Sequence, residues 1–243
     1  MITRKITFLL LFLIFSFGMF AQTAEEYYKQ ALDLDYSKKD EVKKAFAFLQ
    51  KAIALNPEYE DAIDLRAELY DKQESYKEEI IDLTSLIKLD SANAQYFKKR
   101  AAAYVRKNEP EKSITDYSTA FNLDTSLIDC IYERGKIYGE FFVEKKSQQA
   151  IADFTYCINH GSVTLKSQAY VARGRLYENL EKFDKALADY NAATNVNPLN
   201  PDTYLYRGIL KISLNQDGCR DLMKYRDING PDAVEYLKKY CAK

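Results

Sequence analysis

The sequence predicts an all-α protein built from stacked helix–turn–helix repeats. Glycine and proline are scarce, with 8 and 5 residues among 243, which disfavours a turn-rich β-fold. Apolar residues recur with the spacing i, i+3, i+4 and i+7 of helices that bury one face. A small residue followed three positions later by tyrosine recurs at almost constant intervals. Such a fixed period is the sequence signature of a repeat architecture.

The small residue marks the first helix of each repeat. Its occurrences are 34, 34, 39 and 34 residues apart, at Ala67, Ala101, Gly135, Gly174 and Gly208. A second small residue follows in the next helix of four repeats, at Ala45, Ser113, Ala150 and Ala186. Two helices approach closely only where one of them carries a small side chain, so these positions predict contacts between helices. With two helices in each of six repeats, we expect twelve helices. The 39-residue interval predicts an enlarged turn near residues 141–147 and two extra residues near 160–164.

This pattern resembles the tetratricopeptide repeat, a 34-residue helix–turn–helix unit. The resemblance covers about residues 24–230, so we expect about six repeats in a domain of residues 22–230. Residues 231–243 would then form a C-terminal capping helix, since end repeats must cover their apolar face. The resemblance implies a right-handed α-solenoid whose first helices line a concave groove for a peptide or a partner helix. Glu79, Leu86 and Lys211 depart from the family pattern.

Residues 1–21 have the order of features typical of a secretory signal peptide. Arg4 and Lys5 precede an apolar run from Ile6 to about Phe17, and small Ala21 stands before the expected cleavage point. The run is shorter than the roughly 20 residues that span a bilayer. We therefore expect an exported protein, periplasmic or secreted, without membrane insertion after cleavage. The alternative is an uncleaved anchor.

The charge balance argues against one class of partner. Lysine and arginine number 35 against 36 aspartate and glutamate, so the formal net charge is -1. Proteins that bind nucleic acid present a basic excess to the phosphates. We expect no nucleic-acid partner.

An arginine precedes the small residue in five repeats, and an aspartate recurs in the second helix of the same five. The first repeat has neither, with Leu32 and Phe48 at the two positions. This joint absence predicts that the two residues pair within one repeat, where a guanidinium fork can meet a carboxylate. The arginines could instead form a ladder for a ligand, but their matched charges favour structural ion pairs: Arg66 with Asp82, Arg100 with Asp116, Arg134 with Asp153, Arg173 with Asp189 and Arg207 with Asp221.

The spacing of the four cysteines suggests one disulfide and does not decide whether a second one forms. Cys219 and Cys241 lie at equal distances from Gly230, so two antiparallel helices around that turn would bring them together. A disulfide suits an exported protein, and two partly buried thiols are the alternative. Cys130 and Cys157 either pair or remain buried thiols.

Motifs for chemistry are missing from the sequence. The only histidine is His160, and no phosphate loop, nucleophile elbow or metal-ligand spacing is present. We expect no enzymatic activity, no metal and no cofactor.

The family resemblance places a set of side chains on the concave groove. They are acidic, then basic, then apolar along the chain: Asp64, Glu68, Asp71, Lys98, Arg106, Tyr132, Lys136, Arg175, Leu205 and Ile209. Such a groove suits a segment with mixed charge and a hydrophobic end. The C-terminal helix could instead cover the apolar stretch. Some family members hold a C-terminal carboxylate with a lysine and an asparagine where this chain has Gln30 and Leu34, so that function is not expected.

Two functions fit these observations. The first is an adaptor or scaffold of the cell envelope, which binds a segment of another protein in the groove. The second is a structural subunit of an envelope or secreted assembly, which docks through its ends without a specific peptide ligand.

Overall fold

The computed structural model describes residues 22–229 and 234–241, and all regular structure in these ranges is helical. The expected signal peptide lies outside the described residues, as does the turn expected around Gly230. Within the described ranges, no helix combines the length and the apolar character needed to cross a membrane. The helices form two compact units, one ending at Leu89 and the other beginning at Asp90.

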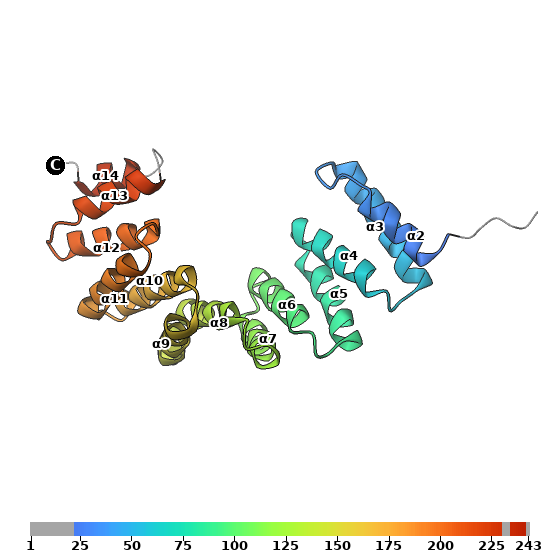
Figure 1. The fold of residues 1–243 in the computed structure, drawn as a ribbon, viewed down its shortest axis with the longest axis horizontal. Coiled ribbons are helices and arrows are strands. Elements are labelled where there is room, and N and C mark those ends of the chain that lie inside the picture. Colours follow the sequence, from blue (N-terminus) through green and yellow to red (C-terminus); the bar gives the residue numbers. More distant parts are fainter. Residues whose placement is uncertain (1–21, 230–233, 242–243) are drawn as a thin grey trace, which may run out of the picture. The chain divides into compact units, whose positions relative to one another are not determined.

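The first unit contains two antiparallel helix pairs (Figure 1). Thr23 caps its first helix, because its hydroxyl accepts from the Glu26 backbone N–H while the Glu26 carboxylate accepts from the Thr23 N–H. Alanine and leucine side chains fill the core between the helices, among them Leu49 and Leu69. The helices are α2 (Ala24–Leu32), α3 (Lys39–Leu55), α4 (Glu60–Lys72) and α5 (Tyr76–Leu89).

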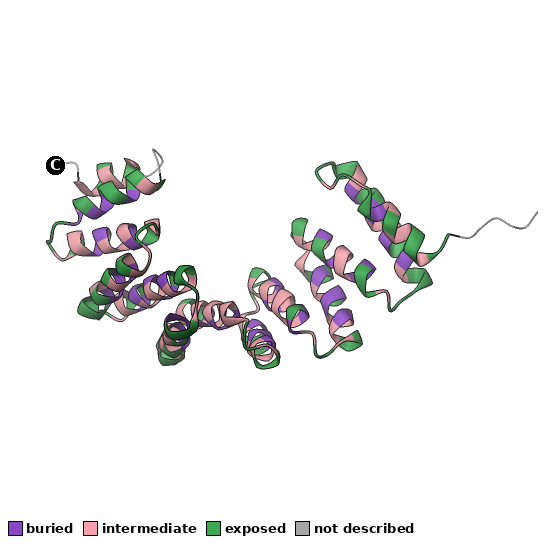
Figure 2. Ribbon diagram, in the orientation of Figure 1, coloured by how far each residue is buried: buried purple, intermediate pink, exposed green. Residues whose placement is uncertain are grey.

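The second unit contains four helix pairs and one additional helix. Each helix packs on the next along the chain, and Figure 2 shows the buried residues on the sides that face neighbouring helices. The thirteen helices of the described residues thus comprise six pairs and α14, which confirms the predicted all-α repeat architecture. The helices of this unit are α6 (Ala94–Arg106), α7 (Pro110–Leu123), α8 (Ile128–Phe141), α9 (Val143–His160), α10 (Val163–Asn179), α11 (Phe183–Val196), α12 (Pro201–Ser213), α13 (Cys219–Asn229) and α14 (Val234–Cys241).

The small residues of the repeat lie where two helices touch. A Cβ atom on Gly174 would stand 2.6 Å from Cε1 of Tyr190, and one on Gly135 would stand 3.0 Å from Cε1 of Phe154. Both ring-bearing residues are almost fully buried. These positions therefore require glycine, because the second helix places an aromatic ring where a Cβ atom would stand.

The long interval between Gly135 and Gly174 is accommodated at two places. The enlarged turn expected near residues 141–147 takes the form of a short helical stretch that begins at Val143 and is separated from the rest of α9 by a kink at the non-helical residue Lys146. Phe142 and Val143, at the start of this stretch, pack against the core. Near residues 160–164, Ser162 caps α10, and this helix has 17 residues where α6 and α12 have 13.

Helix α14 covers the end of the second unit. Tyr236, Leu237 and Tyr240 of this helix pack against the cluster formed by Leu205, Leu222 and Tyr225. No side chain of α14 is fully buried. The structure joins Cys219 of α13 to Cys241 of α14 by a disulfide, with the two Cα atoms 5.8 Å apart. The disulfide therefore adds a covalent link to a helix whose side chains are only partly buried.

Removing the disulfide is expected to release α14. In Cys241→Ser, amide hydrogen exchange should become faster in α14 and in the facing part of α13, while exchange in α10 should not change. Adding a reductant to the wild-type protein should have the same effect and should leave the variant unaffected. Equal protection of α14 in both proteins would show that packing alone holds this helix.

Candidate partner-binding site

The five repeated arginines are engaged inside their own repeats. In each pair, Nε and Nη2 of the arginine donate to the two carboxylate oxygens of the aspartate; in Arg173 both bonds to Asp189 are 2.8 Å. The hydrogen bond to Asp189 raises the pKa of the Arg173 guanidinium. Because the aspartates are buried, these groups hold helices together and are not open to a ligand. The same geometry occurs in Arg66–Asp82, Arg100–Asp116, Arg134–Asp153 and Arg207–Asp221.

Three of these arginines also reach the preceding repeat. Nη1 of Arg173 donates to Oγ1 of Thr155, at 2.7 Å, and Nη1 of Arg134 donates to Oγ of Ser118, at 2.9 Å. Nη1 of Arg207 makes the equivalent bond to Oδ1 of Asn191. We did not predict this second contact, although its signal is present in the sequence: a hydroxyl or amide residue stands two positions after the aspartate.

In the last repeat a lysine replaces the family tyrosine and joins the ion pair. Nζ of Lys211 donates to Oδ2 of Asp221 at 2.9 Å. Burial alone would raise the pKa of Asp221, but the hydrogen bonds from Arg207 and Lys211 together hold it below its usual value. This departure from the repeat pattern therefore adds a cation to the site instead of removing a contact.

The acidic groove residues predicted in the first unit lie along α4. Glu68 is exposed, and Asp64 and Asp71 are half-buried. Tyrosines stand close to this helix: burial raises the pKa of Tyr36, and the charge of Glu68 raises it further. The first unit thus presents carboxylates beside tyrosine rings.

The basic groove residues predicted in the second unit differ in their surroundings. Lys98 of α6 forms an ion pair with Asp129 of α8. Arg106 is exposed in the last turn of α6. Nζ of Lys136 lies 2.9 Å from Glu133 and 5.7 Å from the ring centre of Tyr132. Burial raises the pKa of Tyr132 to about 12, so its hydroxyl stays protonated at neutral pH.

The prediction that Leu205 and Ile209 line an open groove is wrong. Leu205 is only 7% exposed and belongs to the cluster that α14 covers, and Ile209 is partly buried against the same cluster. Side chains of the last described helix, α14, pack against this same apolar cluster, which the sequence analysis assigned in part to a partner.

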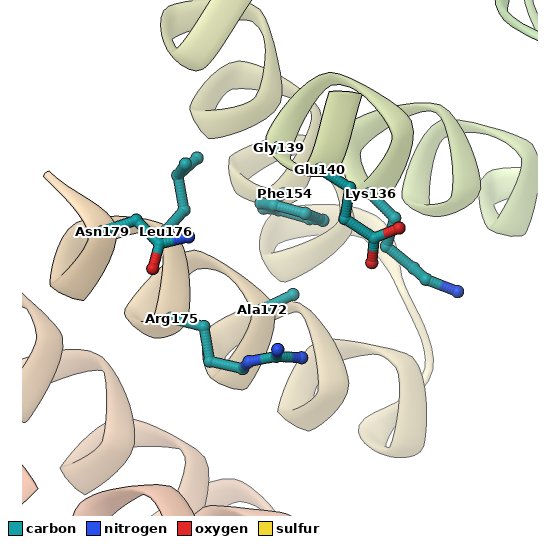
Figure 3. Close-up of a pocket in the computed structure, with 8 residues that line it drawn as sticks. All are labelled: Lys136, Gly139, Glu140, Phe154, Ala172, Arg175, Leu176 and Asn179. Atoms are coloured by element: carbon teal, nitrogen blue, oxygen red, sulfur yellow. The ribbon is translucent and has the colours of Figure 1, made fainter. Parts of the chain in front are cut away.

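Two groove residues, Lys136 and Arg175, meet at a pocket between α8 and α10. Figure 3 shows Lys136 and Glu140 of α8 on one side of the pocket and Arg175 of α10 on another, and Phe154 of α9 also lines it. The cavity holds about 60 Å³. Sites for small molecules usually measure about 300–1,000 Å³, so this one has room for a single side chain. The full lining consists of Lys136, Gly139, Glu140, Phe154, Ala172, Arg175, Leu176 and Asn179.

Gly139 keeps this pocket open. A Cβ atom at this position would have only Cδ1 of Leu176 within 4 Å, at 3.9 Å, which is ordinary contact. Unlike Gly174, Gly139 is therefore not needed for close helix packing. Its missing side chain leaves space at the surface of α8, and sequence reasoning did not identify it as part of a site.

The remaining cysteines are not paired in the structure. Cys130 and Cys157 are both free and buried. Burial raises the pKa of each thiol to about 12. Because the thiolate is the reactive form, neither residue is a nucleophile near neutral pH.

Comparison with known proteins identifies the repeat. Residues 167–198 match the family model of the tetratricopeptide repeat, a range that begins in α10 and ends just after α11. The mitochondrial import receptor subunit TOM70 of Homo sapiens is 24% identical over 155 residues, which are 58% of this chain and 25% of that protein. The chain thus spans a quarter of this relative's length.

Two solved structures share the fold over most of this chain. YrrB, described as a tetratricopeptide repeat protein with an unusual peptide-binding site, has a TM-score of 0.55 and 19% identity, covering 79% of this chain and 97% of its own. PilF of Pseudomonas aeruginosa has a TM-score of 0.60 and 15% identity, covering 89% of this chain and 96% of its own. Together with the helix pairs described above, these similarities show that residues 167–198 match the tetratricopeptide repeat and that the chain has the fold of tetratricopeptide repeat proteins, with six helix pairs among the described residues.

Proposed function

We propose that this protein is a non-enzymatic adaptor or scaffold of the cell envelope that binds a segment of a partner protein on the first helices of its second unit. The observation that carries this proposal is the pocket between α8 and α10, whose size fits one side chain. Tetratricopeptide repeat proteins act as protein-interaction scaffolds, and the relatives above include an import receptor and a protein with a peptide-binding site.

Export is the second part of the proposal. It rests on residues 1–21, with their two basic residues, apolar run and small residue before the cleavage point. The disulfide between Cys219 and Cys241 supports an oxidising compartment such as the periplasm or the extracellular space.

Filling the pocket tests the binding site. Gly139→Leu is expected to abolish capture of the partner, because the backbone has room for a Cβ and the rest of the side chain would occupy the cavity. The measurement is quantitative capture from envelope extracts of the source cells, with the processed chain as bait. The fold should survive, since leucine is a better helix former than glycine by roughly 1 kcal/mol.

The matched control is Ala152→Leu, which adds an apolar side chain at an exposed position of α9 outside the pocket. This variant should capture the same proteins as the wild type. A partner that binds Gly139→Leu and the wild type equally well would refute the proposed site.

The alternative function, a structural subunit that docks through its ends, has less support, because α14 covers the apolar end. It would be favoured if the purified protein self-associates with rising concentration and Gly139→Leu has no effect on capture. Light scattering over a concentration series measures this.

A further inference from the structure

We infer that the pocket between α8 and α10 selects an aliphatic side chain flanked by one acidic and one basic residue of the partner segment. This inference rests on the proposed function and specifies the chemistry of the ligand at the same site. It follows from the charges on the two walls of the pocket and from the apolar surface between them.

Three charged residues line the pocket, and one of them is already neutralised. Lys136 forms its ion pair with Glu133 on the same helix. The structure shows no direct ion pair or hydrogen bond for the charged groups of Glu140 and Arg175 among the described residues. Burial raises the pKa of Glu178, one turn along α10 from Arg175, and the charge of Arg175 opposes this effect. Glu140 belongs to α8 and Arg175 to α10, so an anion and a cation, neither held in a direct ion pair, stand on opposite walls (Figure 3).

Arg175 is restrained by a cation–π contact. Its guanidinium carbon lies 4.7 Å from the ring centre of Tyr206 on α12. A guanidinium has five N–H donors, so those that the ring does not engage can donate to the oxygens of a carboxylate. Because the side chain is already ordered, less conformational entropy is lost when a ligand binds.

The wall between the two charges is apolar. Phe154 is 2% exposed and Leu176 is 3% exposed, and Ala172 adds a methyl group beside them. Gly139 leaves the opening above this surface. A small cavity of this composition accepts an aliphatic side chain, since a polar group would lose its hydrogen bonds to water there.

The three features together predict a mixed-charge segment. A carboxylate of the partner would pair with Arg175, an ammonium or guanidinium with Glu140, and the residue between them would enter the cavity. A segment with only acidic residues would place one carboxylate against Glu140, and a segment with only basic residues would place one cation against Arg175. Like charges in such contact are destabilising.

Short synthetic peptides with Gly–Ser flanks test this rule on the full processed chain by fluorescence anisotropy. The central triplets are Asp–Leu–Lys, Lys–Leu–Asp, Asp–Leu–Asp, Lys–Leu–Lys and Asp–Ser–Lys. The wild type should bind the better of the two mixed peptides about threefold more tightly than either like-charged peptide, which is the effect of a partly exposed ion pair. Asp–Ser–Lys should bind more weakly than Asp–Leu–Lys, and the preference should shrink at high salt.

Charge reversal should change the preferred peptide in a defined direction. Arg175→Glu leaves two acidic walls and should prefer Lys–Leu–Lys, whereas Glu140→Arg leaves two basic walls and should prefer Asp–Leu–Asp. Lys224→Glu, at an exposed position of α13, makes the same change in net charge as Arg175→Glu and should keep the wild-type preference.

The outcomes separate this inference from the proposed function. If the wild type binds no peptide at millimolar concentration, or if reversal at Glu140 and Arg175 leaves the order of affinities unchanged, the inference is wrong. The proposed site still stands in that case if capture of the natural partner depends on Gly139. If capture does not depend on Gly139, the proposed function itself fails.

Discussion

Arg173→Ala is expected to lower the free energy of unfolding by about 3–5 kcal/mol, the usual cost of removing one partner from a buried ion pair. Asp189 is 6% exposed and receives two hydrogen bonds from Arg173. Without them its carboxylate would be buried without a cation, and the bond to Thr155 of the preceding repeat would be lost as well. Chemical denaturation of the full chain measures the change, and hydrogen exchange in α10 and α11 locates it.

A double-mutant cycle separates the ion pair from the other contacts of Arg173. Asp189→Ala should also destabilise, and the double variant should be about 1–3 kcal/mol more stable than the sum of the single changes predicts. Arg226→Ala is the matched control, because Arg226 pairs with Asp227 on the surface of α13; it should change stability by less than about 0.5 kcal/mol. Additive effects of the two substitutions at Arg173 and Asp189 would contradict a coupled pair.

Gly174→Ala is expected to destabilise the protein by about 2 kcal/mol, although alanine is the better helix former. The new Cβ would stand 2.6 Å from Cε1 and 3.0 Å from Cδ1 of Tyr190. The tyrosine cannot move aside easily, because its ring is fully buried and its hydroxyl donates to Glu178. Overpacking of this kind costs about 1–3 kcal/mol. The measurement is the denaturant midpoint of the variant against the wild type.

Gly139→Ala should have the opposite sign. Its Cβ has ordinary contact with Leu176 and nothing else within 4 Å, so the higher helix propensity of alanine should add up to about 1 kcal/mol of stability. The two variants make the same chemical change in the first helices of consecutive repeats. A shift in the same direction for both would show that helix propensity, and not the contact with Tyr190, governs Gly174.

The repeat architecture was predictable from the sequence because its period is strict. The small residue of the first helix faces a large residue of the second helix, as Gly174 faces Tyr190 and Gly135 faces Phe154, and each helix pair repeats this relation. The insertion before Gly174 was harder, because the sequence shows how many residues are added but not whether they pack. Phe142 and Val143 pack against the core, and the short helical stretch that begins there ends in a kink at Lys146.

The pocket could be predicted only in part. The family pattern identified Lys136 and Arg175, but the pocket also depends on Gly139, which periodicity alone does not distinguish from a packing glycine. The difference between Gly139 and Gly174 lies in what faces each one, an aliphatic tip in one case and a buried ring in the other. Leu205 shows the same limit, because the cluster in which it is buried includes contacts with side chains of α14, far from the repeat pattern that suggested a groove.

The arginine–aspartate pairs also bear on how such a chain can lengthen during evolution. Because Arg173 and Asp189 belong to one repeat, a duplicated copy of that repeat would carry both charges with it and would leave neither neighbour with an unpaired buried ion. Pairing across the boundary would instead leave one charge unpaired at each end of the array. The remaining N–H of the arginine needs only a hydroxyl or an amide from the repeat before it, as Ser118, Thr155 and Asn191 show. Gene duplication can therefore add repeats without requiring a new partner for any buried charge.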